Sequence, residues 1–211
     1  MICVSISGID QLPELLEAGV TLLELRLDLI REAPAHIYQQ IPDHVQTIAT
    51  CRPEGYNESE RVELLKTCMD LGANFIDVEI ESSDDYLRTL TTHAHLCGTK
   101  TIMSYHNFDA TPEKKELEHL LQKCYERGGS VAKIAVQVNS LKDVHHLLGL
   151  YKLPGKKVVL GMGKLGRITR LMGPYLGAEF TFGAPGTGSE TAPGQFSYNQ
   201  LTDIYKVIDE S

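Results

Sequence analysis

A single lysine interrupts an otherwise apolar run, Ser130-Val131-Ala132-Lys133-Ile134-Ala135-Val136-Gln137. The small and β-branched residues of this run are typical of a short buried strand. Lysine is almost never fully buried unless another group pairs with it or a function uses it. Burial lowers the pKa of a lysine, and the neutral amine is a nucleophile that can form a Schiff base with a ketone or aldehyde. On the strand alone, the simpler interpretation is favoured: Lys133 reaches solvent at the strand end or pairs with a carboxylate.

Seven further apolar runs alternate with helix-length amphipathic segments. With the run at residues 130–137, they predict strands at residues 2–7, 21–26, 45–52, 74–80, 99–106, 156–162 and 179–183. Helices are predicted near residues 11–18, 35–40, 58–71, 84–95, 112–126, 141–150, 166–175 and 197–209. This alternation requires a parallel sheet covered by helices. Eight units in 211 residues favour an α/β fold of the (β/α)8 (TIM) barrel type, and we expect one domain over residues 1–211.

Composition and charge exclude several classes of partner. The formal net charge is −8 and no long basic run is present, so we expect neither nucleic acid nor membrane as a partner. No apolar run approaches the roughly 20 residues of a membrane span, and the first residues lead directly into strand-like sequence without the layout of a signal peptide. The five cysteines form no Cys-x-x-Cys pair, which predicts reduced thiols and a cytoplasmic location.

Polar residues gather at the C-terminal ends of the predicted strands, where (β/α)8 enzymes carry their active sites. In chain order they are Glu24, Arg26, Asp28, Arg52, Glu54, Asp77, Glu79, Ser104, His106 and Lys133. Each residue alone has a simpler explanation, such as a salt bridge, a turn, a helix cap or a structural histidine. Five strands that end in such groups at one mouth favour a catalytic site. The Gly- and Pro-rich segment at residues 183–194 suits a mobile loop over that mouth.

Metal and phosphate sites receive little support from the sequence. No group of His, Cys and carboxylate residues shows the spacing of metal ligands, so we expect no metal. His93 and His95 lie near a predicted helix end, where we expect solvated or capping side chains. Two glycines, Gly163 and Gly166, alternate with basic residues in a weak resemblance to a phosphate-binding loop.

Several motifs occur together in the order and spacing of one known family. They are Val4-Ser5, Glu24-Leu25-Arg26-Leu27-Asp28, Arg52-Pro53-Glu54-Gly55, Ile76-Asp77-Val78-Glu79, Met103-Ser104-Tyr105-His106-Asn107-Phe108, Ala132-Lys133-Ile134-Ala135, Met162-Gly163-Lys164-x-Gly166-x-x-Thr169-Arg170-Leu171, Phe180-Thr181-Phe182-Gly183 and Ala192-Pro193-Gly194-Gln195. On these motifs the chain resembles the type I 3-dehydroquinate dehydratases over nearly its whole length. That family dehydrates 3-dehydroquinate to 3-dehydroshikimate in the shikimate pathway, on a (β/α)8 barrel without a metal or organic cofactor.

The resemblance implies three catalytic residues. Lys133 matches the family lysine that forms an imine with the C3 ketone of the substrate. His106 matches the general base that removes the C2 proton and then assists loss of the C1 hydroxyl, a double role that suits a pKa near neutrality. Glu54 matches the glutamate that orients this histidine. Asn107 stands where the family usually has Asp, which removes a carboxylate beside the base.

The resemblance also implies a substrate-binding set. Arg170 matches the arginine that pairs with the substrate carboxylate, for which a planar fork suits better than an ammonium. The remaining binding and pocket-lining residues are Ser5, Glu24, Arg26, Arg52, Met162, Phe182, Thr191 and Gln195. Members of the family are often homodimers, and some are fused to shikimate dehydrogenase in a longer chain. We therefore expect 3-dehydroquinate as a small-molecule partner, with a homodimer or such a fusion as further expectations.

Two other functions are consistent with parts of the pattern. A class I aldolase acting on a phosphorylated sugar would use the same lysine but would need a phosphate site after the seventh and eighth strands. A catalytically inactive barrel that serves as a binding module would be expected to have lost Lys133, His106 or Arg170, and all three are present. The motifs around Arg170 and Gln195 favour a substrate with a carboxylate and hydroxyl groups.

Overall fold

Eight parallel strands form the centre of the molecule. The computed structural model describes residues 1–190 and 192–210. The strands are β1 (Ile2–Ile6), β2 (Leu22–Arg26), β3 (Gln46–Thr50), β4 (Phe75–Glu79), β5 (Lys100–Asn107), β6 (Val131–Gln137), β7 (Lys157–Met162) and β8 (Thr181–Gly183). All eight predicted strands are confirmed, and their ends differ from the prediction by two residues at most.

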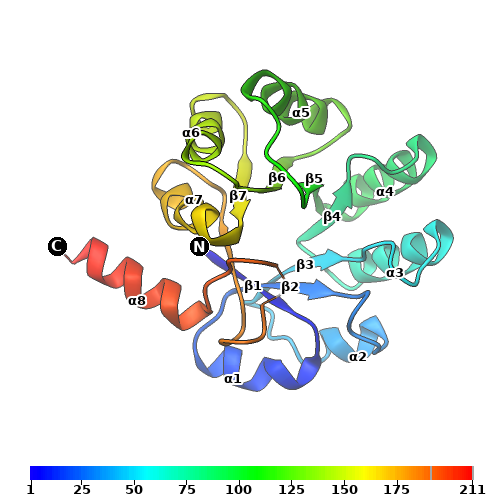
Figure 1. Cartoon of the computed structure of the whole chain (residues 1–211). Coiled ribbons are helices and arrows are strands. Elements are labelled where there is room, and N and C mark those ends of the chain that lie inside the picture. The colour runs from blue at the N-terminus through cyan, green and yellow to red at the C-terminus, as the bar shows by residue number, and fades with distance from the viewer. Residues whose placement is uncertain (191, 211) are drawn as a thin grey trace.

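Helices follow the strands and surround them (Figure 1). They are α1 (Leu12–Glu17), α2 (Pro34–Tyr38), α3 (Glu58–Asp70), α4 (Asp84–Cys97), α5 (Lys114–Glu126), α6 (Leu141–Gly149), α7 (Gly163–Tyr175) and α8 (Tyr198–Asp209), with short 3-10 turns at Ile9–Gln11 and Leu150–Lys152. Side chains of Asn57, Ser83, Ser140 and Ser197 accept backbone N–H bonds at the starts of four of them, which fixes where these helices begin. No helix in the described ranges is long and apolar enough to cross a membrane.

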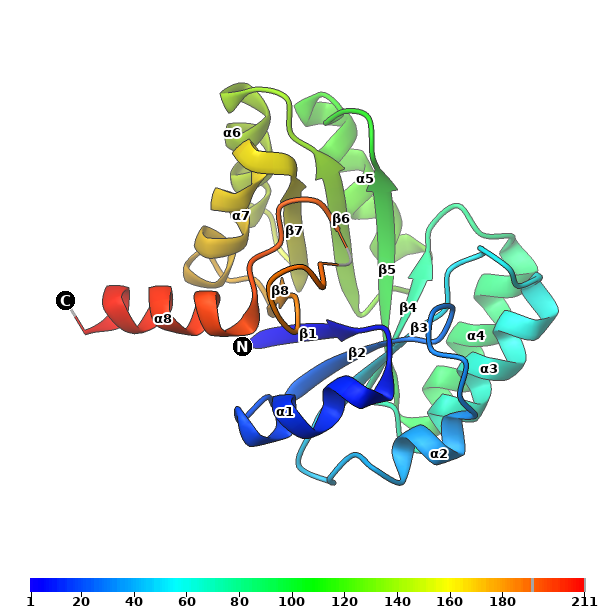
Figure 2. The ribbon, with the colours of Figure 1, turned by 60° about the horizontal axis from the view of Figure 1, so that its bottom comes forward.

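The strands form a nearly closed barrel. Their order in the sheet is β7-β6-β5-β4-β3-β2-β1-β8, with every pairing parallel. Figure 2 shows β8 in the gap between β1 and β7, and the N–H of Glu179, just before β8, donates to the carbonyl of Lys157 at the start of β7 over 3.0 Å. In both views α8 extends away from the barrel. The predicted (β/α)8 barrel in a single domain is confirmed.

Alternate residues of each strand face the barrel interior. Near the N-terminal ends of the strands these residues are apolar and fully or almost fully buried, namely Cys3, Leu22, Ile48, Phe75, Ile102, Val131, Val158 and Phe180. The intervening residues, such as Ala132, Ile134 and Val136 of β6, belong to a second buried cluster between the strands and the helices. Lys133 therefore lies on the interior face of β6, between Val131 and Ala135.

One predicted boundary is wrong. Helix α7 begins at Gly163, three residues before the predicted start at residue 166. Gly163 has a left-handed backbone (φ +76°), and Gly166 lies so close to β7 that a Cβ atom there would come within 2.4 Å of the carbonyl carbon of Gly161. The two glycines therefore serve the turn into α7 and its close packing on β7 rather than forming a phosphate-binding loop.

Candidate active site

A polar layer lies above the apolar floor of the barrel. Two residues beyond the apolar residues of the same strands, the interior side chains are Ser5, Glu24, Thr50, Asp77, Ser104 and Lys133, all at least 95% buried. Two residues further along come Arg26, Arg52, Glu79 and His106. Most of these side chains line a small cavity of about 210 Å³, and their convergent polar groups are what a binding site for a small polar molecule requires. Of the predicted site residues, all but Thr191 line this cavity, and Thr191 lies outside the described residues.

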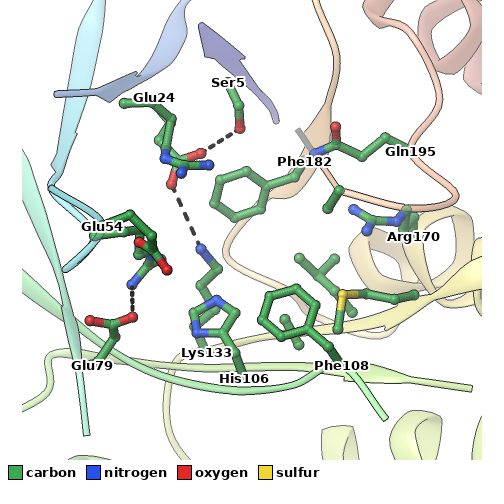
Figure 3. A pocket seen from close by; sticks show the side chains of 16 residues that line it. Ser5, Glu24, Glu54, Glu79, His106, Phe108, Lys133, Arg170, Phe182 and Gln195 are labelled. Carbon is green, nitrogen blue, oxygen red and sulfur yellow. Dashed lines mark hydrogen bonds and ion pairs between the residues drawn. The ribbon is translucent and has the colours of Figure 1, made fainter. Parts of the chain in front are cut away.

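Lys133 is paired with acids and also faces the cavity (Figure 3). Its Nζ lies 2.7 Å from Asp77 Oδ2 and 3.8 Å from Glu24 Oε1. The same nitrogen lies 4.4 Å from the centre of the Phe182 ring. The simpler interpretation, a lysine paired with a carboxylate, therefore describes the resting state, and the open side of the same nitrogen is available to a ligand in the cavity.

Asp77 connects two cations. Its Oδ1 atom accepts a 2.6 Å hydrogen bond from Ser104 Oγ and lies 3.0 Å from Arg52 Nη2. Burial alone would raise the pKa of Asp77, but Arg52 and Lys133 hold it far below its usual range. Asp77 is therefore ionised at neutral pH, and its low pKa makes it a poor proton acceptor there. It was noted among the strand-end acids but not assigned to the predicted site.

Glu24 and Arg26 have different partners. Ser5 Oγ donates to Oε2 of Glu24, and Thr50 Oγ1 donates to Oε1 over 2.9 Å. Arg26 does not pair with Glu24, since its Nε donates to Asp28 Oδ1 over 3.0 Å. Two hydroxyl donors and Lys133 thus fix the Glu24 carboxylate, while Asp28 orients the Arg26 guanidinium.

His106 lies at the cavity wall with its ring stacked on Phe108, 6.3 Å between ring centres and 12° between planes. Burial, followed by the positive charges of Arg52 and Lys133, lowers the pKa of His106 well below the ordinary histidine value, and the opposing effect of Asp77 is smaller. The expectation of a pKa near neutrality is therefore wrong for the unliganded site. The imidazole is neutral at neutral pH, which is the form that can accept a proton.

Glu54 lies in a more exposed part of the wall. Its side chain lines the cavity, but no hydrogen bond connects it to His106 within the described residues. Figure 3 shows Glu54 on the same side of the cavity as Glu79. The orienting role predicted for Glu54 therefore stays a prediction.

Arg61 of α3 supports the acidic side of the cavity from outside the barrel. Its Nη2 lies 2.9 Å from Glu79, which in turn lies 3.4 Å from Arg52. The Arg61 Nε atom donates to the carbonyl of Cys51 over 2.8 Å, and the guanidinium lies over the ring of Tyr86. Sequence reasoning missed this residue. The available signal was a charged residue on the same helix face as buried positions four and seven residues later.

Arg170 of α7 is the most distinctive residue of the opposite wall. Its side chain is 1% exposed, yet its Nε and Nη1 atoms have no hydrogen-bond partner within residues 1–190 and 192–210. Burial, with a smaller effect of Arg167, lowers the pKa of Arg170 to about 10, so the guanidinium remains charged at neutral pH. A buried charge without a partner is strongly unfavourable, which marks this position as a binding site for an anion.

The segment after β8 closes over this wall. Ala192 and Gln195 line the cavity, and Gln195 is 7% exposed. The N–H of Gly163 at the start of α7 donates to the carbonyl of Pro193 over 3.2 Å. Figure 3 shows Gln195 and Arg170 on the side of the cavity away from Glu54 and Glu79. The cavity therefore has a cationic wall, an acidic wall, and a lysine and a histidine between them.

The residues that could hold a metal lie elsewhere. Within the described ranges, the group of His, Cys and carboxylate side chains close enough to share an ion is Asp70, His93 and Cys97, on α3 and α4. Spacing along the sequence did not indicate this group, because the fold joins residues from two helices, and the expectation that the protein needs no metal stays a prediction.

Comparison with known proteins gives a consistent family. A model of the family "Type I 3-dehydroquinase" matches residues 2–211. The 3-dehydroquinate dehydratase of Methanocaldococcus jannaschii is 33% identical over 197 residues, covering 89% of this chain and 87% of that protein. The type I 3-dehydroquinate dehydratase of Clostridium difficile, solved with covalently modified comenic acid, gives a TM-score of 0.87 at 26% identity, covering 99% of this chain and 92% of that one.

A second solved structure shows a similar barrel inside a longer protein. The dehydroquinate dehydratase and shikimate dehydrogenase of S. pombe gives a TM-score of 0.79 at 23% identity, covering all of this chain and 44% of that one. At this identity the likeness concerns the fold alone. The family match over residues 2–211, together with the relative from Methanocaldococcus jannaschii, is decisive: the chain belongs to the type I 3-dehydroquinase family.

Proposed function

We propose that this protein is a 3-dehydroquinate dehydratase that converts its substrate to 3-dehydroshikimate through a Schiff base on Lys133. The observation that carries the proposal is the buried guanidinium of Arg170, whose Nε and Nη1 have no hydrogen-bond partner among residues 1–190 and 192–210, in the same cavity as Lys133 and His106. The substrate has a carboxylate on C1 of its ring and a ketone at C3, with the reacting C2 between them. An anion on Arg170 would place the rest of a small ring in the cavity, within reach of the lysine.

The first half of the reaction forms the imine. The Lys133 ammonium gives up a proton and its amine attacks the C3 carbonyl, and the carbinolamine takes a proton back as it loses water, which gives a protonated imine. The positive charge stays on the same nitrogen, so Asp77 and Glu24 continue to face it. Because Asp77 is held ionised, it favours the protonated imine, which withdraws electrons from the neighbouring C2–H bond.

The second half removes water. Neutral His106 accepts the C2 proton, the electron pair of that bond forms the new double bond, and the C1–O bond breaks. His106 then returns its proton to the departing hydroxide, so the leaving group is water. Hydrolysis of the imine releases the product and restores Lys133. The low pKa of His106 in the unliganded site ensures that the base form is present before the substrate arrives.

Other cavity residues bind and orient the ring in this proposal. Glu24, Arg26, Arg52 and Gln195 supply hydrogen-bonding groups for the ring hydroxyls, and Ser5, Met162 and Phe182 shape the cavity. Thr191 retains its predicted place in the binding set. Glu54 is proposed to orient His106 in the substrate complex, since both side chains line the same cavity.

The aldolase alternative is less well supported. An aldolase for phosphorylated sugars would need free backbone N–H groups near the start of α7. The N–H of Gly163 donates to Pro193, and Gly166 is in close contact with Gly161. These contacts favour a carboxylate on Arg170 over a phosphate on the start of α7.

Borohydride trapping tests the nucleophile. Borohydride added with substrate should reduce the imine and attach the ligand permanently to the peptide that contains Lys133, as read by mass spectrometry. Lys133→Ala should lose both the adduct and the absorbance of the conjugated enone product. Buried Lys157 is an internal control, because its Nζ donates to the carbonyls of Leu153 and Gly155. An adduct on Lys157, Lys164 or Lys100 would refute the assignment.

The same assay separates the base from the nucleophile. His106→Ala should lose about 10²–10⁴-fold in rate, because a positioned base is missing. It should still trap an adduct, since imine formation depends on Lys133. Full turnover by His106→Ala would leave the lysine chemistry intact and assign the base to another residue, with Glu54 the first to test.

A further inference from the structure

Three potential metal ligands meet on the outer surface, between α3 and α4. His93 Nε2 lies 2.8 Å from Asp70 Oδ1, and Cys97 Sγ lies 3.5 Å from the same oxygen. One ligand atom from each side chain lies within 4.8 Å of the other two. With metal–ligand bonds of roughly 2.0–2.3 Å, ligand atoms around a tetrahedral zinc ion lie about 3–4 Å apart. The three side chains are therefore already near the spacing that such an ion needs.

The backbone holds these ligands on rigid elements. His93 and Cys97 are four residues apart on α4, so they share one face of the helix. Asp70 is the last residue of α3, which packs against α4. Gly98, with φ +72°, ends α4 directly after the cysteine. Small rotations of three side chains would be enough to bring them onto a shared ion.

We propose that Asp70, His93 and Cys97 bind one Zn²⁺ or a closely related divalent transition metal, with water as the fourth ligand. A nitrogen, a thiolate sulfur and a carboxylate oxygen form a ligand set that suits zinc and cobalt better than magnesium or calcium. On binding, the Cys97 thiol loses its proton to solvent as the metal–sulfur bond forms, and neutral His93 presents its Nε2 lone pair. Cys97 is exposed, so the ion can enter from solvent.

The position of the site separates it from catalysis. Helices α3 and α4 both end at the N-terminal side of the following strands, β4 and β5. The cavity with Lys133 and His106 lies toward the opposite, C-terminal ends of the strands. The ion would therefore connect the ends of two helices and protect the exposed thiol, with no part in turnover.

A cobalt titration tests the proposal. Tag-free protein, reduced with a phosphine and freed of metal by dialysis, is titrated with cobalt chloride. One equivalent should give visible bands of tetrahedral intensity and a near-ultraviolet band from sulfur-to-cobalt charge transfer. Zinc chloride should displace the cobalt, raise the melting temperature and slow alkylation of Cys97.

Matched variants locate the site. Cys97→Ser should lose the charge-transfer band, and Asp70→Asn and His93→Gln should each weaken cobalt binding at least tenfold. His95→Gln is the control, because His95 is exposed on the same helix two residues away and is not among the three clustered ligands. All four variants should keep the wild-type turnover, which shows that they fold. Absence of the sulfur band in the wild type, or equal affinity in Cys97→Ser and His95→Gln, would overturn the proposal.

Discussion

The surroundings of Asp77 and His106 set their protonation states in opposite ways, and Lys133 contributes to both. Asp77 stays ionised because Arg52 and Lys133 face it, and His106 stays neutral because burial and the same two cations oppose its protonation. The acid nearest the lysine is therefore a fixed negative charge, and the histidine is the group free to move a proton. A carboxyl and an imidazole in one cavity receive different roles from their surroundings.

The pH dependence follows from the low pKa of His106. For the free enzyme, kcat/KM rises with pH as the base loses its proton, and it levels off above the pKa of that base. We expect wild-type kcat/KM, measured by enone absorbance, to be on its plateau at pH 6.5, the ordinary histidine value, and to fall only at lower pH. The low pKa of folded His106 also affects stability. Below pH 6.5 the free energy of unfolding should fall, because His106 binds a proton in the unfolded chain and does not in the folded one.

Arg52 provides the control for this profile. Its positive charge lowers the pKa of His106, so Arg52→Gln should move the acid limb of kcat/KM toward neutral pH. An acid limb already at pH 6.5 in the wild type, or one that does not move in the variant, would contradict this account of the base.

Replacing Arg170 should weaken substrate binding without lowering the stability of the free protein. Arg170→Met keeps a long side chain but removes the guanidinium, and with it charge-assisted hydrogen bonds of about 1.5–3 kcal/mol to a bound carboxylate. We expect the apparent substrate affinity to fall by about 10- to 150-fold. The free protein should unfold at the same or a higher urea concentration, because the substitution removes a buried charge with two nitrogens that have no partner in the described part of the chain. Unchanged affinity would show that the carboxylate binds elsewhere.

At the scale of elements, the two-residue period of the strands builds the cavity. In β6, Val131 belongs to the apolar floor, Lys133 to the polar layer above it, and Ala135 to the cavity wall. The same step leads from Phe75 to Asp77 to Glu79 in β4, and from Ile102 to Ser104 to His106 in β5. A shift of one residue in any strand would send its polar groups into the layer between strands and helices.

The contact between α7 and β7 positions Arg170. By helix propensity alone, Gly166→Ala should stabilise α7. The added Cβ would lie 2.4 Å from the carbonyl carbon of Gly161, however, so helix and strand must separate. We expect a loss of about 1–3 kcal/mol in the free energy of unfolding, measured with urea, and a higher KM because Arg170 moves with the helix.

Gly149→Ala is the matched control for this substitution. Gly149 ends α6 with φ −61°, and a Cβ atom there would meet nothing within 4 Å. The substitution should stabilise the protein by about 0.4–1 kcal/mol and leave KM unchanged. Equal effects of the two substitutions would mean that the close approach at Gly166 does not constrain α7.

At the scale of the whole molecule, the sequence predicted whatever depends on period and chain order. The eight strands could be predicted because each apolar run is short and bounded by turn residues. The location of the active site could be predicted because the C-terminal ends of parallel strands lie at one side of the barrel. Helix α7 was begun too late because Gly163 and Gly166 resembled a loop, whereas their role is close packing.

Contacts between residues far apart in the chain could not be read from the sequence. The ion pair from Lys133 to Asp77 depends on how β6 faces β4 inside the barrel, and the pair from Arg61 to Glu79 depends on how α3 packs against the end of β4. The cluster of Asp70 with His93 and Cys97 joins residues 23 or more positions apart on two helices. The pKa of His106 depends on Arg52, which follows β3, and on Lys133 of β6. The sequence therefore could not show that this pKa is lowered.

The two ends of the barrel should respond differently to a chelator. Around the cavity, the carboxylate oxygens of Asp77 and Glu24 already accept from Lys133, Arg52 and three hydroxyl groups, which leaves little room for a metal ion among them. Dialysis of zinc-loaded enzyme against a chelator should therefore lower the melting temperature through the α3–α4 site while kcat and KM stay unchanged. Asp70→Asn, without the site, should keep the same melting temperature before and after this dialysis. If chelation abolished turnover and zinc or magnesium restored it, the reaction would depend on a metal and the Schiff-base proposal would fail, whatever the outcome for the surface site.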